Sequence, residues 1–331
     1  MSGMTNMRWN LLLFVAAAAM PAALPAAGQT SKAAGPAQSE TQSAASVPDF
    51  SGVWNHPAFP WFEPPVSGPG PITNLSRWAE QIPAGATGSA ALPPTTVGIS
   101  DYDQLVGDYK SPILQPWAAA VVKRFGEMSI AGITYPNPSN QCWPFPMPFI
   151  YKNFMVQMLQ QPDKITMLYS GDHEVRRVRL NQPHPSKLKP SWYGDSVGHY
   201  EGDTLVIDTV GVRTDRPYAM LDLFGTPYTG KLHIVERYRL RDYDDVKDAL
   251  ERNKKENWLF NGDVWTQQQR GKFLQLQVTI EDEGVFTTPW TATLTYAPTQ
   301  DQIPEGVCSE NPHEYYSNKD SDVPKARKPD F

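Results

Sequence analysis

Short stretches of alternating apolar and polar residues, separated by turn residues, recur along the second half of the chain. They fall at residues 154–160, 165–169, 175–180, 197–200, 204–210, 232–240, 274–280 and 291–296. Two of the intervening segments, 161–164 and 201–203, have the composition of tight hairpin turns. Such alternation is typical of strands that bury one face. The pattern therefore predicts a mainly β protein whose sheet is an antiparallel meander.

An open meander of this length would leave two unpaired edge strands, and closing the sheet removes them. We therefore expect a lipocalin-like β-barrel, or at least a strongly curved sheet, in preference to a two-sheet sandwich. The sequence shows no internal repeat, which makes a propeller less favoured than a barrel. Ten Trp, fourteen Tyr and thirteen Phe residues supply large side chains for a core or for an apolar pocket.

Two helices are expected at the periphery of this β core, which we place at residues 150–300. Apolar residues at spacings of three and four predict an amphipathic helix at 113–130. A charged segment from about Asp244 to Glu256 predicts a helical insertion between two strands. Residues 48–110 are rich in proline and show little periodicity, which predicts an extended arm on the surface of the core.

The first 28 residues have the layout of a secretory signal peptide. Arg8 precedes an apolar run that ends in small residues, and prolines interrupt that run, so it does not suit a membrane span. Residues 29–47 contain almost no large apolar side chain and predict a disordered linker. We expect the remaining residues, 48–331, to form a single domain. We expect a periplasmic or secreted protein with no membrane span.

The chain contains only two cysteines, Cys142 and Cys308. Disulfides form and persist in exported proteins, so we expect these two residues to pair, with a pair of free thiols as the alternative. Closing a loop of this length would stabilise the fold by roughly 4 to 5 kcal/mol in the loop-entropy model.

Three of the six histidines lie within 27 residues, in a stretch that is also rich in carboxylates, arginines and aromatic residues. Histidine titrates near neutral pH, and a nearby carboxylate fixes its tautomer and raises its basicity. The stretch therefore predicts acid–base catalysis, with structural histidines at strand ends as the alternative. The candidate catalytic residues are His184, His199, Asp195, Tyr200, Glu201 and His173. The candidate substrate-binding residues are Arg177, Trp192, Tyr193 and Ser196.

Other interpretations of the same residues remain open. Residues 194–198 fit the G-x-S-x-G pattern of a serine nucleophile, but that motif needs a strand-to-helix turn, so we favour a Ser196 that bonds to the backbone beside two glycines that allow a close turn. Arg177 and Arg179 share one face of a strand and could bind a carboxylate. A buried ion pair with Glu236 or Asp208 is the alternative. Aromatic residues of the stretch could equally belong to the core.

Several functions are disfavoured by the sequence. No H-E-x-x-H or H-x-H spacing is present, so zinc or another divalent metal would bind only if histidines converged through folding. We expect no cofactor, since phosphate-binding and dinucleotide-binding glycine patterns are also missing from the sequence. The net charge is −6, with dispersed cationic residues, which disfavours a nucleic acid partner.

Three runs of the sequence resemble the signature of a large family of exported bacterial proteins. They are D-H-E-V-R-R-V-R-L-N at 172–181, H-P at 184–185, and S-W-Y-G-D-S-V-G-H-Y-E-G-D-T-L at 191–205. The likeness covers most of the chain after the signal segment, and it differs at Pro146, where many relatives have glycine. The resemblance implies export and transfers no particular reaction.

These observations lead to one functional hypothesis and two alternatives. We expect an exported, cofactor-independent enzyme that acts on a small apolar or aromatic molecule in the mouth of the barrel, as a lyase, isomerase or hydrolase. The first alternative is a lipocalin-like binding or carrier protein of the cell envelope. The second is a structural domain associated with the envelope.

Overall fold

The structure is a computed structural model that describes residues 47–56, 62–63, 65, 67–75, 105–133, 135–152, 155–171, 174–216, 219–256, 271–303, 305 and 308. For residues 252–256 it describes the backbone alone. The predicted signal peptide lies outside the described residues, and so does the predicted linker apart from Val47.

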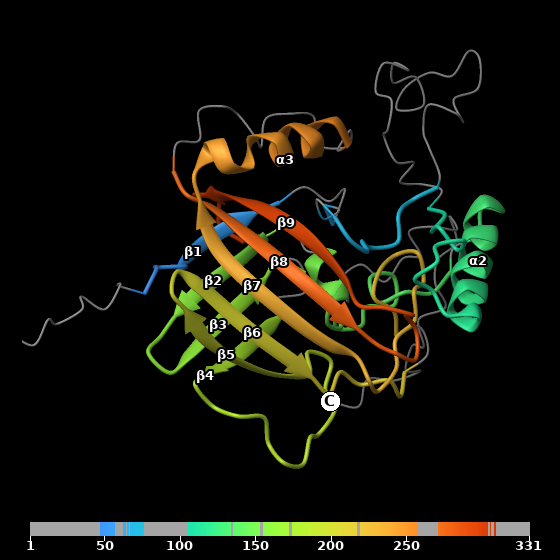
Figure 1. Cartoon of the computed structure of the whole chain (residues 1–331), viewed down its shortest axis with the longest axis horizontal. Coiled ribbons are helices and arrows are strands. Elements are labelled where there is room, and N and C mark those ends of the chain that lie inside the picture. The colour runs from blue at the N-terminus through green and yellow to red at the C-terminus, as the bar shows by residue number, and fades with distance from the viewer. Residues whose placement is uncertain are drawn as a thin grey trace, which may run out of the picture. The chain divides into compact units, whose positions relative to one another are not determined.

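Nine β-strands and two α-helices form the regular structure of the described residues (Figure 1). The strands are β1 (Gly52–Asn55), β2 (Met155–Gln160), β3 (Lys164–Tyr169), β4 (Val175–Leu180), β5 (Asp195–Glu201), β6 (Thr204–Val210), β7 (His233–Arg241), β8 (Phe273–Glu281) and β9 (Trp290–Thr299). The helices are α2 (Pro116–Ile130), α3 (Tyr243–Glu256) and a short 3-10 helix, η2 (Phe149–Lys152).

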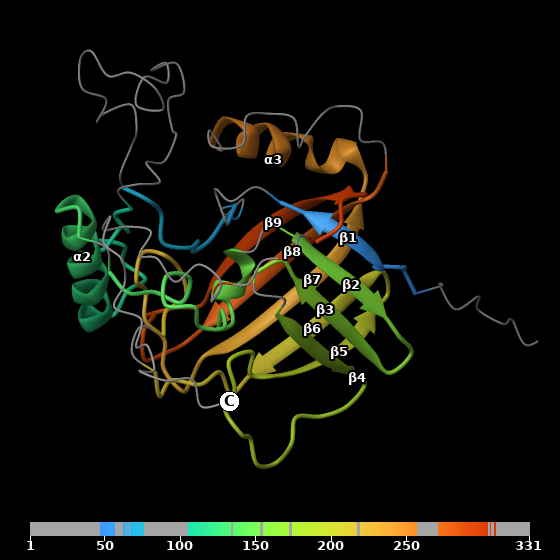
Figure 2. The ribbon, with the colours of Figure 1, turned by 180° about the vertical axis from the view of Figure 1, so that it is seen from behind.

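The strands form one closed barrel in which each strand pairs with the strands before and after it in the sequence. The barrel closes at β1, where Trp54 stands opposite Val156 of β2 on one side and Pro298 of β9 on the other. The two opposite views show the strands following one another around the barrel (Figure 1 and Figure 2). The prediction of a mainly β, closed barrel is confirmed.

One pair of neighbouring strands differs from the predicted antiparallel meander. β4 and β5 run parallel, with Val178 opposite Ser196 and Leu180 opposite Gly198, whereas the other neighbouring pairs are antiparallel. Parallel neighbours need a crossover connection of about a dozen residues or more. Residues 181–194 form this crossover loop, and it runs back along the outside of the barrel.

The prediction of a surface arm at residues 48–110 is wrong near its start, because β1 (Gly52–Asn55) is a strand of the barrel. The side chain of Trp54 is 6% exposed, and its indole nitrogen donates a 3.0 Å hydrogen bond to the carbonyl oxygen of the fully buried Phe50. Four residues are too few to show a strand period in the sequence, so only the pairing with β2 and β9 defines this strand. Residues 76–104 of the predicted arm lie outside the described part of the chain.

Helix α2 begins at Pro116, later than the predicted start at residue 113. Gln115 has an extended backbone with ψ of 147°, because a following proline disfavours the helical conformation. Proline is well suited to the first helical position, where no N–H is needed. The helix buries Val122 and Gly126, and a Cβ atom on Gly126 would lie 2.9 Å from Val106. Small side chains thus allow close packing against the preceding segment.

The predicted charged insertion is confirmed as α3, between β7 and β8. Val246 and Leu250 pack against Phe273 of β8 and Ala297 of β9. Both strand residues alternate with side chains that face the barrel interior, so α3 covers part of the outer face.

The predicted turn between β5 and β6 is also confirmed. Glu201 pairs with Thr204, and Gly202 between them has φ of 61°, a left-handed conformation that glycine adopts without steric cost. Gly194 has φ of 67°, and a Cβ atom there would lie 2.5 Å from the carbonyl oxygen of Val210. Gly194 therefore permits the close approach expected of it at the end of the crossover loop.

The predicted disulfide joins Cys142 to Cys308, with a Cα–Cα distance of 5.4 Å. It ties the segment before η2 to the chain beyond β9. None of the helices in the described part of the chain combines the length and the apolar composition that a membrane crossing requires.

Candidate functional site

The outer face of the barrel carries two histidines that alternate with three carboxylates across strands β5 to β8. Asp195, Asp208, His233 and Glu281 lie on successive strands, and His184 reaches them from the crossover loop. The four strand residues face outward because their neighbours along each strand point into the barrel. We name these five residues the outer-face histidine row.

Neighbouring members of this row are in hydrogen-bond contact. His184 lies between two carboxylates, with Nδ1 2.6 Å from Asp195 Oδ1 and Nε2 2.9 Å from Asp208 Oδ1. The other oxygen of Asp208, Oδ2, is 2.9 Å from His233 Nε2. The row ends where His233 Nδ1 lies 3.3 Å from Glu281 Oε2. Asp208 thus joins the two imidazoles.

The strand register brings these residues together. His233 stands directly opposite Glu281 in the β7–β8 pair. Asp208 stands opposite Val235, so it lies diagonally across from His233, within reach of long side chains. At the other end of the row, Arg179 donates a 2.7 Å hydrogen bond to Asp195 Oδ1.

The row keeps His233 protonated. Its hydrogen bond to Asp208 is the main cause that raises the pKa of His233 from 6.5 to about 9, and Glu281 adds to the effect. The same bond, with one from His184, lowers the pKa of Asp208 below its ordinary value of 3.8. His233 is therefore an imidazolium at neutral pH, and both of its ring nitrogens donate. The Nδ1–H bond to Glu281 is the longest of the row, so this proton is the one most readily given to another acceptor.

A groove of about 390 Å³ opens beside His233 and Glu281. Its walls come from the start of β7, the end of β8 and the loop that leads to β9. The groove is lined by Lys231, His233, Glu281, Glu283, Phe286, Thr287, Thr288 and Pro289, among others. The His233 and Glu281 side chains are 32% and 46% exposed. An imidazolium and a carboxylate are thus accessible at one side of a groove that also offers hydroxyl groups and apolar surface.

Hydrogen bonds from neighbouring segments hold the groove wall in place. Asp282 is 3% exposed and accepts from the backbone N–H of Thr229 at 2.6 Å and from its hydroxyl at 2.7 Å. From the other side, the indole of Trp117 in α2 donates to the carbonyl oxygen of Gly284 at 2.7 Å. The loop before β9 is therefore anchored both to the segment that precedes β7 and to α2.

A second polar cluster lies inside the barrel, centred on Arg176 and Glu236, which are 1% and 0% exposed. The guanidinium of Arg176 donates to both carboxylate oxygens of Glu236 and to the hydroxyls of Ser196 and Thr209. The hydroxyl of Tyr238 donates to Glu236 at 2.8 Å. Burial opposes the charge on Arg176, but the adjacent carboxylate outweighs it and raises the pKa of the guanidinium. The cluster is a closed network that links β4, β5, β6 and β7.

Ser196 belongs to this interior network. It is 4% exposed, lies within a strand, and its Oγ is 3.1 Å from Arg176 Nη2 and 2.9 Å from Thr209 Oγ1. Its hydrogen bonds therefore go to side chains, and the predicted bond to the backbone is wrong. Ser196 faces the barrel interior, away from the outer groove.

The three arginines of β4 differ in their surroundings from the prediction, which gave a buried ion pair to Arg177 or Arg179. Arg177 is exposed on the outer face, and Arg179 pairs with Asp195. The ion pair with Glu236 is made by Arg176 instead, because the strand alternation turns Arg176 inward and its two arginine neighbours outward.

His199 and Glu201 form a separate pair farther along β5, 3.1 Å apart. Glu201 also accepts a 2.6 Å bond from Arg237. His199 is four residues from Asp195 along the strand, about 13 Å, so it does not contact the outer-face histidine row. Tyr200 points to the other side of the strand, where its hydroxyl is buried without a partner among the described residues, and burial raises its pKa.

Trp192 and Tyr193 lie at the end of the crossover loop, outside the groove. The guanidinium of Arg213 is 5.1 Å from the centre of the Trp192 ring system, and the Trp143 ring is 6.1 Å away. Tyr193 packs against the hydrophobic core. Tyr193 therefore belongs to the core, as the alternative interpretation of the aromatic residues expected. Trp192 belongs to a half-buried aromatic group beside the disulfide.

His173 lies outside the described residues. Within the described ranges, no group of three or more His, Cys, Asp or Glu residues is arranged to hold a metal ion.

Comparisons with protein-family models, with curated proteins and with solved structures give no significant match for this chain. The fold and the site therefore define its class by themselves: a closed, mixed nine-stranded barrel with a histidine and carboxylate site on its outer face.

His233 and Glu281 are not among the site residues predicted from the sequence, and Asp208 was considered only as an ion-pair partner of an arginine. The sequence held one signal for these residues, because consecutive strands usually pair. Asp208 and His233 lie on consecutive predicted strands, and Glu281 directly follows the next one. The strand register that places His233 beside Asp208 and Glu281 is set by the whole barrel, and it cannot be predicted from a local sequence pattern.

The protein is expected to lose stability between about pH 6.5 and pH 9 through His233. Its pKa in the folded protein is about 9 and about 6.5 when unfolded, so the stabilisation is complete below pH 6.5 and is lost as the pH rises through 9. Because the side chain is 32% exposed, we expect about 1 to 2 kcal/mol after solvent screening. Urea denaturation at pH 6 and pH 9.5 measures the change. Parallel pH profiles for the wild type and His233→Gln would contradict this assignment.

Proposed function

We propose that the protein is an enzyme that acts on a small molecule in the groove beside His233 by proton transfer. The observation that carries the proposal is the position of His233 at the groove, with Nε2 2.9 Å from Asp208 Oδ2 and an exposed Glu281 beside it. A proton donor and a potential proton acceptor thus meet at one accessible place, as acid–base catalysis requires. The reaction class is that of a lyase, isomerase or hydrolase.

Each residue has a distinct role in this proposal. The substrate replaces Glu281 as the acceptor of the Nδ1 proton of His233, which is then transferred to the reacting group. Asp208 keeps the Nε2 proton in place, so the neutral imidazole has a defined tautomer. The released Glu281 accepts the proton that the substrate loses. His184 holds the second oxygen of Asp208 and is a positioning residue.

The lining of the groove favours a substrate with two kinds of surface. Phe286 and Pro289 offer apolar contacts, which suit a small apolar or aromatic molecule. Lys231 and the hydroxyl of Thr288 offer donors for a polar group at the reacting end. The acid and the base are side chains of the protein, so the proposed chemistry needs no cofactor.

A carrier with its ligand inside the barrel is the alternative function. The interior is crossed by the Arg176–Glu236 pair, and the facing side chains Met158, Met167 and Ile207 are fully buried. This packing favours a ligand in the outer groove over one inside the barrel.

We also propose that the protein acts outside the cytoplasm. The Cys142–Cys308 disulfide supports this, because such bonds persist in oxidising compartments.

Loss of His233 is expected to abolish most of the activity. Purified protein is incubated with an extract of environmental aromatic compounds, and the masses are followed over time. The wild type should convert at least one compound, and His233→Gln should slow the conversion at least about a hundredfold, since it removes the proton donor.

The matched control is His199→Gln, the same substitution on the same face of the barrel but away from the groove. It should convert the compound at the wild-type rate. Equal rates for His233→Gln and the wild type would refute the proposal, as would an unchanged extract. A loss in His199→Gln alone would move the catalytic role to the His199–Glu201 pair.

A further inference from the structure

The crossover loop is attached to the barrel near its two ends. The backbone N–H of Asn181 donates to the carbonyl oxygen of Gly198 at 2.7 Å, and that of Ser191 donates to the carbonyl oxygen of Gly211 at 3.1 Å. Every residue between Asn181 and Ser191 is exposed except His184. The position of the middle of the loop therefore depends on the contacts of its side chains.

His184 supplies the hydrogen bonds that hold this middle part. Of the residues between the two attachments, all of which the structure describes, it alone makes side-chain hydrogen bonds, to Asp195 on β5 and to Asp208 on β6. The other contact is apolar, because a Cβ atom on Gly211 would lie 3.7 Å from Leu188. Leu188 stays 38% exposed, so this contact buries little surface. One imidazole thus fastens the loop to two strands.

The two bonds of His184 form together only when the ring carries two protons. Both nitrogens face carboxylate oxygens, which accept and do not donate, and a neutral ring has a single N–H. The carboxylates have other cationic partners on the neighbouring strands. Arg179 of β4 donates to Asp195 Oδ1 at 2.7 Å, and His233 of β7 lies 2.9 Å from Asp208 Oδ2. Loss of one proton from His184 therefore turns a lone pair toward a carboxylate and removes one of the two bonds.

We propose that His184 is a pH-sensitive latch of the crossover loop. The imidazolium fastens the loop to β5 and β6, and release of one ring proton to solvent opens the latch as the pH rises. Opening also leaves His233 as the one imidazole partner of Asp208, so the state of the loop is coupled to the outer-face histidine row. The latch goes beyond the activity proposed for the groove, and its test needs no substrate.

Limited digestion of the full-length protein with trypsin tests the latch. Trypsin can cut the middle of the loop after Lys187, whereas Lys189 precedes a proline and resists cleavage. The protease must draw an extended segment around Lys187 into its active site, so the loop has to open first. Peptide masses report the rate of this cut between pH 6 and pH 9.

The matched control is His184→Gln, which cannot form the charged latch and is digested at the same pH values. Dividing the two rates removes the pH dependence of trypsin itself. At pH 6 the wild type should be cut at least about tenfold more slowly than the variant, because it has charge-assisted bonds to break. At pH 9 the two rates should converge. A ratio that is the same at pH 6 and pH 9 would overturn the proposal.

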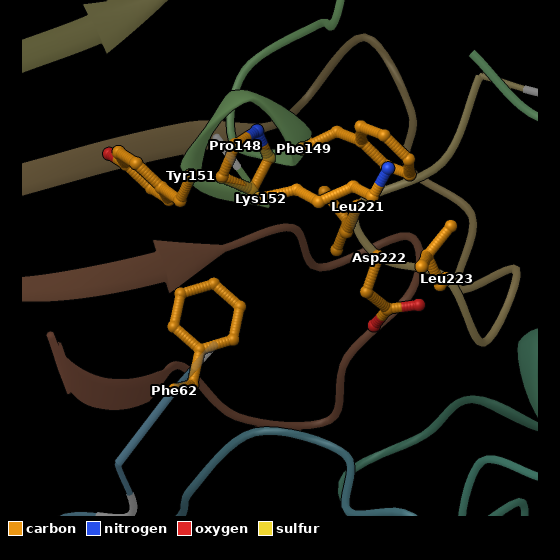
Figure 3. A pocket seen from close by; sticks show the side chains of 8 residues that line it. All are labelled: Phe62, Pro148, Phe149, Tyr151, Lys152, Leu221, Asp222 and Leu223. Carbon is orange, nitrogen blue, oxygen red and sulfur yellow. The ribbon is translucent and has the colours of Figure 1, made fainter. Parts of the chain in front are cut away.

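A cut after Lys152 reports unfolding of the whole barrel instead. The side chain of Lys152 lies among those of Phe149, Leu221 and Leu223 at a small cavity (Figure 3), so trypsin reaches it only when this packing is lost. Lys152 should remain uncut while Lys187 is cut. Equal rates at the two lysines would also contradict the latch, because cleavage would then follow global unfolding.

Asp208→Asn distinguishes the latch from a histidine with a purely structural role. Asparagine can turn its NH₂ group toward Nε2 of a neutral His184 and keep its oxygen toward His233. The neutral ring then bonds on both sides, since its remaining proton on Nδ1 faces Asp195. At pH 9 this variant should be cut several-fold more slowly than the wild type. Cutting at the wild-type rate or faster would show that the protonation of His184 does not control the loop.

Discussion

Replacing Arg176 with methionine is expected to lower the free energy of unfolding by about 3 to 5 kcal/mol. The substitution leaves the Glu236 carboxylate, which is 0% exposed, without the guanidinium that neutralises it. It also removes the donor to the hydroxyls of Ser196 and Thr209. Of the bonds to the carboxylate described above, only that from Tyr238 would remain. Urea denaturation followed by tryptophan fluorescence measures the loss.

The matched control is Arg237→Met, which breaks an exposed ion pair on the outer face of β7. Arg237 and Glu201 are 36% and 47% exposed, and exposed pairs contribute less than about 1 kcal/mol. The double variant Arg176→Met with Glu236→Leu should recover much of the loss, because no charge is then buried alone. If Arg176→Met is no more destabilising than Arg237→Met, the interior pair does not hold the barrel together.

Reduction of the Cys142–Cys308 disulfide is expected to lower the free energy of unfolding by about 4 to 5 kcal/mol. The two cysteines are 166 residues apart, and the closed loop contains η2 and all the strands except β1. A long loop of this kind restricts the unfolded chain strongly, so opening it raises the entropy of the unfolded state. Urea denaturation with and without reductant measures the change.

The double variant Cys142→Ser with Cys308→Ser provides the control. It should have the stability of the reduced wild type and should not respond to reductant. If reduction leaves the wild type as stable as before, the loop-entropy explanation fails for this protein.

Most strands could be predicted because a half-buried strand leaves a local record. In β4, for example, Arg176, Val178 and Leu180 point inward and alternate with outward residues, which is the period seen in the sequence. The turn at Gly202 and the disulfide could also be predicted, the first from local backbone chemistry and the second from the presence of only two cysteines.

Two features of the fold could not be predicted, because they depend on pairing between distant segments. β1 is too short to show a period, and it exists because β2 and β9 offer it partners a hundred residues away or more. The parallel orientation of β5 follows from the path of the crossover loop, which the composition of that loop does not specify.

The candidate site also contains residues that could be predicted from the sequence and residues that could not. His184 and Asp195 could be selected because a short stretch of sequence is rich in titratable residues, and the structure places them 2.6 Å apart. His233 and Glu281 lie 48 residues apart, and neither stands in such a stretch. Their contact with Asp208 depends on the registers of the β6–β7 and β7–β8 pairs.

Periodicity, turn chemistry and residue counts are local properties, and they were enough to predict the closed β-barrel, the helix at α3, the disulfide pair and one half of the histidine and carboxylate site. The folded chain was needed to show which arginine enters the interior ion pair, how β1 closes the barrel and which histidine borders the groove. Those outcomes depend on register and on the path of the crossover loop, and both are set by the packing of the whole barrel.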